Sequence, residues 1–190
     1  MSEPMTRRGP YAVGTERKAQ LVRATERLVL EHGHQNVTMR MVAAAVGVSE
    51  AAAYHHFSSR DELLVAVIGF RDEGEGARDV VDLVHHLVTI AAENQRSPHA
   101  VELFADMAAK ASDRQHPAHA FFADRYARIT KTLEEAVLAD QRAGRLSTRL
   151  SAHATAVTLI SLMDGLQTRW LVTPDLDMAD HLRQLIDALR

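Results

Sequence analysis

TMRMVAAAVGVSEAAAYHHFSSRDELL, at residues 38–64, is the stretch that decides the fold. Two short helix-forming segments flank Gly47 and Val48. Glycine supplies the positive φ that a sharp turn between crossing helices needs. Ser49 and Ser59 each stand where a side chain can cap the helix that follows. The pattern predicts a helix-turn-helix, whose second helix enters the major groove of DNA.

Outside this stretch, apolar residues recur at helical spacing, and glycine and proline fall between the periodic segments. Alternation of β-branched residues is almost absent, so no strand is expected. We predict an all-α chain of about nine helices. The expected ranges are 15 to 31 or 32, 38–47, 49–55, 59 to 69 or 73, 77–94, 98–112, 117–143, 151–172 and 176–189.

These helices divide into three regions. Residues 1–14 are expected to form a flexible arm, residues 15–64 a three-helix head, and residues 65–190 a helical body. The glycines of GEG, at residues 74–76, mark the expected junction between head and body.

The composition indicates a globular protein without cysteine chemistry. The 190 residues are 46% hydrophobic, which is enough to bury a core. No cysteine is present, which excludes disulfides and thiolate sites. No apolar run approaches the roughly 18 to 20 residues of a membrane span, and the first residues lack the apolar stretch of a secretory signal. We expect a soluble, cytoplasmic protein with no membrane partner.

Charge is distributed unevenly along the chain. The formal net charge is -3, which alone argues weakly against binding to nucleic acid. Residues 1–60, however, hold 8 Lys and Arg against 5 Asp and Glu, while the remainder holds 14 against 20. The first third of the chain can therefore lie against phosphates, whereas the rest cannot.

Motifs for catalysis and metal binding are missing from the sequence. It has no Gly-rich phosphate loop, no nucleophile elbow and no H-E-x-x-H, so we expect neither an enzyme nor a cofactor. The chain holds 11 histidines, but adjacent histidines on a helix point about 100° apart and do not chelate together. His116 and His119 flank Pro117 without a completing carboxylate, so no metal site is predicted.

The stretch at residues 38–64 resembles the N-terminal signature of the TetR family of transcription regulators. That signature is a threonine, then I-A-x-x-A-G-V-S, then a tyrosine and a phenylalanine, then K-x-x-L. Val42 stands for the isoleucine and Arg60 for the lysine. The resemblance covers roughly residues 15–64 and implies a homodimer on a palindromic double-stranded DNA operator, with a body for ligand binding and dimerisation. The matching positions are Thr38, Ala43, Gly47, Val48, Ser49, Tyr54, Phe57 and Leu63.

By this resemblance, the head contacts both phosphates and bases. Thr38, Tyr54, His55 and Arg60 are expected on the phosphate backbone, where Arg60 and the N-terminus of its helix would hold one phosphate together. Where the family often has glycine, then serine or threonine, then leucine, this chain has three alanines, so base readout is left to few groups. The other expected contacts are Arg17, Lys18, Arg40, Ser49, Glu50, Ala51 and Ala52, with Arg7 and Arg8 of the arm reaching a minor groove.

The resemblance also implies a cavity for an inducer between body helices, although aromatic and Met side chains fill the core of most helical proteins. Such pockets are mostly apolar with a few polar anchors. Because the body is negative, we expect a neutral or cationic, largely apolar effector. The expected lining is Phe104, Met107, Phe122, Tyr126, Met163 and Trp170, with His85, His86, Asp106 and Gln167 as candidate anchors.

Two stripes near the C-terminus are candidates for a dimer interface. A face of small side chains lets another helix pack closely. Two such helices from each of two chains would form a four-helix interface, as in the family; in the alternative, both stripes face the chain's own body. The small stripe is Ala154, Thr158, Ser161, Gly165 and Thr168, and the apolar stripe is Leu182, Leu185, Ile186 and Leu189.

The sequence therefore predicts a ligand-responsive, DNA-binding transcription regulator, and specifically a repressor released by a small apolar effector. Two alternatives stay open: a transcriptional activator, and a helical binding module without a small-molecule effector that keeps the head only as a fold element. The presence of Thr38, Tyr54 and Arg60 together favours the regulator.

Overall fold

The computed structural model describes the backbone of residues 10–76 and 83–190, and the side chains of residues 14–73 and 86–190. Within these ranges the chain has nine α-helices, one short 3-10 helix and no strand, which confirms the predicted all-α fold. Three residues named above are not covered: Arg7 and Arg8 lie outside the described residues, as does the side chain of His85.

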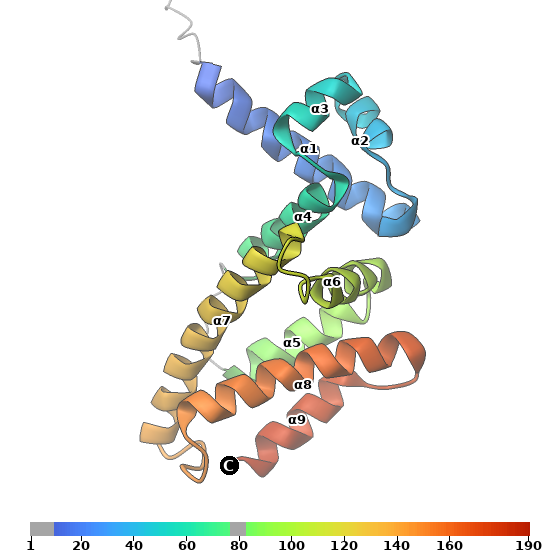
Figure 1. The fold of residues 1–190 in the computed structure, drawn as a ribbon. Helices are drawn as coiled ribbons and strands as arrows, with labels where there is room; N and C mark the ends of the chain where they lie inside the picture. Colours follow the sequence, from blue (N-terminus) through green and yellow to red (C-terminus); the bar gives the residue numbers. More distant parts are fainter. Residues whose placement is uncertain (1–9, 77–82) are drawn as a thin grey trace, which may run out of the picture.

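The head comprises α1, η1, α2 and α3, followed by α4, which leads into the body (Figure 1). The bounds are α1 Pro10–His32, η1 His34–Asn36, α2 Met39–Val46, α3 Glu50–His56 and α4 Arg60–Gly76. The body helices are α5 Leu83–Asn94, α6 Pro98–Lys110, α7 Pro117–Arg142, α8 Ala152–Val172 and α9 Met178–Ala188. Figure 1 shows α2 and α3 at one end of the molecule, and α8 and α9 at the opposite end.

Two features of the head differ from the prediction. α1 begins at Pro10, five residues before the expected start, because proline's fixed φ suits the first turn of a helix. The turn η1 was not expected, and it gives the connection between α1 and α2 a defined shape.

The predicted domain boundary after Leu64 falls inside α4, and the GEG segment lies at the C-terminal end of that helix.

Local capping explains the helix-turn-helix. The Thr38 hydroxyl accepts a hydrogen bond from the Met41 amide at 3.3 Å, and the Ser49 hydroxyl accepts one from the Ala52 amide at 3.2 Å. Between these caps, Gly47 ends α2 with φ 72° and ψ 36°, in the left-handed region. The two short helices therefore start and stop where their own side chains and one glycine dictate.

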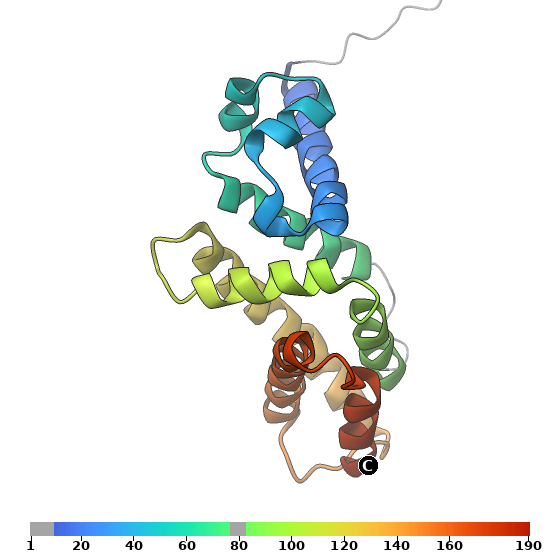
Figure 2. The ribbon, with the colours of Figure 1, turned by 90° about the vertical axis from the view of Figure 1, so that its right-hand side faces the viewer.

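One hydrophobic core joins the head to the body. Leu21, Val42 and Phe57 fill the centre of the head and are at most 1% exposed. The same cluster takes in side chains from two body helices, α6 and α7, which Figure 2 shows beneath the head. Those body residues are Leu103, Met107, Ala118 and Phe122.

The glycine after α1 provides a test of the connection into the helix-turn-helix. Gly33 has φ 76° and ψ 144°, a region almost restricted to glycine, and a Cβ there would lie 3.3 Å from His99 Nδ1. We expect Gly33→Ala to lower the free energy of unfolding by about 2 to 3 kcal/mol. The matched control is Gly47→Ala, where the added Cβ meets nothing within 4 Å. It should cost only about 1 to 2 kcal/mol for the left-handed backbone.

Urea unfolding of the two variants and the wild type measures this difference. Equal losses for Gly33→Ala and Gly47→Ala would contradict the account of the α1–η1 connection.

Candidate nucleic-acid interface and effector cavity

The recognition helix α3 presents several predicted DNA contacts to solvent. Tyr54 is 46% exposed, and Glu50, Ala51 and His55 are also exposed, whereas Ala53 is fully buried against the head core. The side chains of Glu50 and Tyr54 form no hydrogen bond or ion pair with the rest of the described chain, so both are available to a partner.

The other predicted contacts lie on α1 and around α2. Thr38, Arg40 and Ser49 are exposed, and Thr38 and Ser49 also act as the helix caps described above. Lys18 is exposed and its ammonium lies 5.0 Å from the centre of the Phe57 ring. The remaining two, Arg17 and Ala52, are half-buried, and Arg17 donates to Gln20 at 2.9 Å.

The contacts of Arg60 differ from those predicted for a residue that binds phosphate. Its Nε donates to the Val37 carbonyl at 2.7 Å, and a second guanidinium nitrogen donates to the His34 carbonyl. A third contact, at 3.4 Å, joins the guanidinium to the carboxylate of Asp61. The guanidinium therefore holds the η1–α2 connection to the start of α4.

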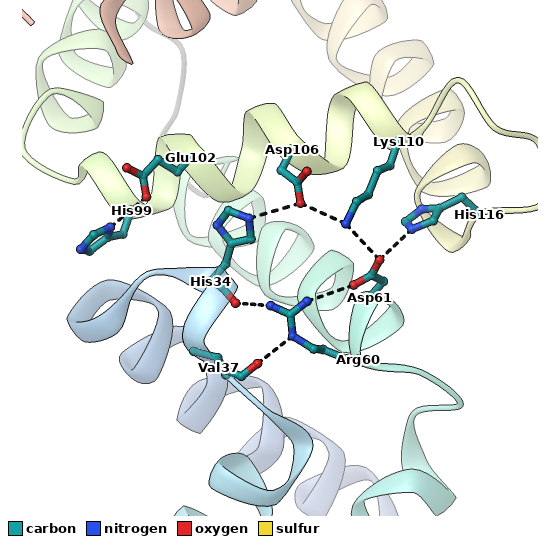
Figure 3. A network of polar contacts seen from close by, with 9 residues as sticks. All are labelled: His34, Val37, Arg60, Asp61, His99, Glu102, Asp106, Lys110 and His116. Carbon is teal, nitrogen blue, oxygen red and sulfur yellow. Dashed lines mark hydrogen bonds and ion pairs between the residues drawn. The ribbon is translucent and has the colours of Figure 1, made fainter. Parts of the chain in front are cut away.

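A chain of polar contacts closes the boundary between head and body (Figure 3). Asp61, at the start of α4, accepts from Lys110 Nζ at 3.2 Å and contacts His116 Nε2 at 2.9 Å. Lys110 also pairs with Asp106 at 3.1 Å, and Asp106 contacts His34 Nε2 at 3.2 Å. We call these five residues the junction network; they come from η1, α4, α6 and the residue that caps α7.

Electrostatics at the junction favour the charged forms of Asp61 and Lys110. Burial alone would raise the pKa of Asp61, but hydrogen bonds from His116 and Lys110 and the charges of Lys110 and Arg60 outweigh it. The pKa of Asp61 consequently lies below its ordinary value of 3.8. For Lys110, burial would lower the pKa, yet hydrogen bonds and charges of Asp106 and Asp61 raise it above 10.5.

Two predicted ligand contacts and one predicted anchor belong to this boundary instead of a cavity. Met107 is fully buried and Phe122 is 2% exposed, and both lie in the core shared with the head. Asp106 is bound in the junction network. These three predictions are wrong, because α6 and the first turns of α7 pack against the head.

A cavity of about 400 Å³ opens lower in the body, between α4, α5, α6, α7 and α8. Three of the predicted residues line it, namely Phe104, Met163 and Gln167, and so does the candidate anchor His86. Most of the remaining wall is aliphatic, from Leu87, Ile90, Ile129, Leu133, Leu159 and Ile160.

The polar part of the wall lies where α4 and α7 meet. Asp72 accepts from Arg125 Nε at 2.8 Å and from Arg125 Nη2 at 3.1 Å, and Arg128 lies 3.5 Å away. The guanidinium of Arg125 also lies 4.9 Å from the centre of the Phe104 ring. This bidentate ion pair joins the helix that leaves the head to the wall of the cavity.

A second carboxylate faces the cavity from α8. Asp164 accepts a 2.6 Å hydrogen bond from the hydroxyl of Tyr126. Burial raises the pKa of Asp164 more than the Tyr126 hydrogen bond and the charge of Arg125 lower it. Burial and Asp164 together raise the pKa of Tyr126 above its ordinary value of 10.0, so the hydroxyl stays a donor.

Tyr126 and Trp170 were predicted to line the cavity, but neither side chain is part of its wall. Tyr126 supports Asp164 from behind, and Trp170 is 8% exposed in a separate core with Met178 and Leu182. Of the charged wall residues, Arg125 was expected near the cavity but among cations that mostly face solvent, and Asp164 was not predicted. Each is a charged residue on an otherwise apolar helical face, and Asp164 is the only charged residue between Ala152 and Thr168.

The two predicted dimer stripes have different surroundings. On α8, Thr158, Ser161, Gly165 and Thr168 are exposed and Ala154 is half-buried, while the larger apolar side chains of that helix face inward. On α9 the stripe packs in the chain's own cores, and its role in a dimer stays a prediction. Leu182 and Ile186 are 0% exposed, and Leu185 and Leu189 pack against the same core as Ile186.

The described ranges hold neither a cluster of metal-ligating side chains nor a membrane-spanning helix. No three His, Asp or Glu side chains are placed there to hold a metal ion. None of the helices found there is both long enough and apolar enough to cross a membrane.

Comparison with known proteins agrees with both halves of the chain. Residues 21–67 match the model of the bacterial regulatory proteins of the tetR family, and residues 81–189 match the model of the BetI-type transcriptional repressor, C-terminal. The chain belongs to the TetR family. Members of this family are DNA-binding transcription regulators and not enzymes, which confirms the predicted class.

Individual relatives within the TetR family are distant. The regulator TtgR of Pseudomonas putida is 28% identical over 194 residues, covering 90% of this chain and 89% of TtgR. A TetR-family regulator from Rhodococcus sp. has a solved structure with a TM-score of 0.68 at 27% identity, covering 92% of this chain and 98% of that one. A regulator from Saccharomonospora viridis, solved with choline, gives a TM-score of 0.70 at 20% identity, with coverage of 92% and 95%.

The junction network predicts how stability depends on pH. A carboxyl whose pKa is lowered by folding stabilises the fold above its unfolded pKa, and this stabilisation is lost as pH falls through the folded pKa. For Asp61 the loss begins below about pH 3.8, its ordinary pKa. We expect Asp61→Asn to lower the free energy of unfolding at pH 7 by about 1 to 3 kcal/mol. The variant should also lose less stability than the wild type between pH 5 and pH 3.

Urea unfolding across this pH range measures the effect. Asp113→Asn, an exposed carboxylate in the α6–α7 connection, is the control and should keep the wild-type profile. An Asp61→Asn profile parallel to that of the wild type would show that the junction network contributes no net stability.

Proposed function

We propose that this TetR-family protein is a ligand-responsive repressor that binds a palindromic operator as a homodimer and is released by a small, largely apolar effector. The observation that carries the proposal is the position of α4. One end of this helix holds Asp61 in the junction network, and the other brings Asp72 to the cavity wall. A ligand in the cavity can therefore contact one end of α4, while the other end of the same helix lies at the junction with the head.

The span between the two ends is short. Asp61 and Asp72 are separated by three helical turns, about 16 Å along the helix axis. A ligand that favours one position of Asp72 over another favours one placement of α4, and so one placement of the head. This is a shift between two states, and it requires the ligand to bind one of them more tightly.

Repression and DNA contact rest on separate observations. Repression, in preference to activation, is supported by the match of residues 81–189 to the BetI-type repressor model. DNA contact is supported by the exposure of α3 and of Lys18 and Arg40 on the same head. A repressor that acts on chromosomal DNA is expected in the cytoplasm.

The dimer surface is proposed on the outer face of α8. Its small side chains are exposed, and so are two apolar neighbours, Val157 at 42% and Val172 at 82%. A Cβ added at Gly165 meets nothing within 4 Å, so the chain's own packing does not require the glycine. A face of small and apolar residues fits a second copy of the same helix.

The choline complex of the Saccharomonospora viridis regulator is consistent with a small-molecule cavity in this fold. In our chain the cavity volume of about 400 Å³ lies within the usual range of small-molecule sites. The aliphatic wall accounts for the apolar character proposed for the effector.

DNA binding is tested by two substitutions on α3. Tyr54→Phe removes one exposed hydroxyl and should weaken binding to every duplex by about three- to tenfold, the effect of one hydrogen bond. Glu50→Gln should instead alter the preference among sequences, because a carboxylate and an amide favour different base edges. Gel shifts on a random duplex pool at several salt concentrations measure both effects.

The control for these substitutions is Lys131→Ala, an exposed cation on the body helix α7. It should leave affinity and salt dependence unchanged. A wild-type protein without salt-sensitive affinity for any duplex would refute the proposed role of the head.

The dimer is tested by Gly165→Arg. The added guanidinium has room within one chain but would collide with a second α8, so the variant should be a folded monomer with much weaker operator binding. Sedimentation velocity gives the mass and thermal unfolding checks the fold. Ala109→Arg, at an exposed position of α6, is the matched control and should remain dimeric. An undiminished dimer in Gly165→Arg would place the interface elsewhere.

A further inference from the structure

The two carboxylates of the cavity wall, Asp72 and Asp164, have different partners. Arg125 neutralises Asp72 through two hydrogen bonds, and Arg128, which is 58% exposed, extends mainly into solvent. Asp164 is left with the neutral hydroxyl of Tyr126 as its hydrogen-bond donor. Among the described residues, no Lys, Arg or His nitrogen lies within 4.0 Å of the Asp164 carboxylate. The inner wall of the cavity thus carries one carboxylate without an ion-pair partner.

A second acceptor lies one helical turn further along the same face. Gln167 is 7% exposed and lines the cavity, yet its Oε1 has no hydrogen-bond partner in the described structure. Buried polar atoms in folded proteins are nearly always hydrogen-bonded, so an unpartnered one at a cavity wall indicates a missing donor. Residues three apart on a helix are neighbours, which puts Asp164 and Gln167 side by side.

Opposite these acceptors the wall is mainly aliphatic. Ile129 and Leu133 follow Arg125 along α7, and Leu159 and Ile160 precede Asp164 on α8. The charged groups therefore lie at the α4 end of the cavity, while the aliphatic groups, with His86 and Thr132 beside them, form the rest of the wall. An occupant that matches this arrangement has a polar group at one end and an apolar body.

We propose that the effector is an amphiphile with a primary or secondary amine, whose protonated nitrogen donates to Asp164 and Gln167 while its apolar part lies between α7 and α8. This inference rests on the proposed function and names the chemical class of the effector. An ammonium group has only donors, a carboxylate has only acceptors, and Gln167 adds a further acceptor. The amine supplies both the missing charge and the missing donors.

Other head groups fit less well. A quaternary ammonium supplies the charge but has no N–H to donate. An alcohol supplies one donor but leaves Asp164 without a counter-charge in a largely apolar space, which is costly. A carboxylate would bring like charge close to Asp164.

The test uses the full-length protein and three probes with the same apolar chain: octylamine, octyltrimethylammonium and 1-octanol. Isothermal titration calorimetry at pH 7 should show that octylamine binds at least about tenfold more tightly than either of the others. Asp164→Asn keeps the shape and a hydrogen-bond acceptor for Tyr126, and should abolish the preference of octylamine over 1-octanol. Gln167→Leu should weaken octylamine binding several-fold and leave 1-octanol binding unchanged.

Asp175→Asn, an exposed carboxylate between α8 and α9, is the control and should keep the wild-type order of affinities. The same probes are then tested for release of the tightest duplex selected from a random pool. Equal binding of all three probes, with release of the duplex, would overturn the amine inference and leave the proposed function intact. Preferential binding of octylamine without release would support the amine site and refute the proposed function. No binding by any probe would overturn the amine inference, while the gel-shift and sedimentation tests of the proposed function stand apart from this result.

Discussion

The carboxylate of Asp61 is the contact on which the relation of the head to the body depends. It stands at the first turn of α4 and binds groups from α6 and from the cap of α7, while Arg60 beside it holds the η1–α2 connection. These side chains, together with the core that the head shares with α6 and α7, set the direction in which α3 faces. Because α3 lies at the far end of the head, a small rotation at Asp61 becomes a large displacement at the DNA-facing surface (Figure 1).

The fold of the head was predictable from sequence because local chemistry determines it. Thr38, Gly47 and Ser49 act within a few residues of their own positions, so their roles could be assigned without knowing the rest of the fold. Arg60 could not be assigned in this way. A motif gives the position of a side chain but not its direction. The carbonyls that accept from this guanidinium belong to a 3-10 turn that was not predicted and to Val37, the residue that follows it.

In the body, the helices were predictable but the partners of their faces were not. An apolar stripe requires burial without specifying the surface that buries it, which is why α9 turned out to pack on its own chain. For the same reason, the sequence could not show which of the predicted aromatic and Met residues lie in the core shared with the head and which line the cavity. The pairing of Arg125 with Asp72 was not predicted, because charged residues usually face solvent. Their burial becomes understandable only when two residues 53 positions apart are seen to pair.

The shared core means that this head is not an exchangeable module. Its hydrophobic centre is completed by Leu103, Met107, Ala118 and Phe122, all of which lie beyond the end of α4. In a chimeric regulator joined after α4, the head would expose an apolar surface and would meet a body shaped for a different head. Successful grafts would have to transplant α6 and the first turns of α7 along with the DNA-reading helices. The recombination of heads and bodies is therefore constrained by packing and not only by the length of the linker.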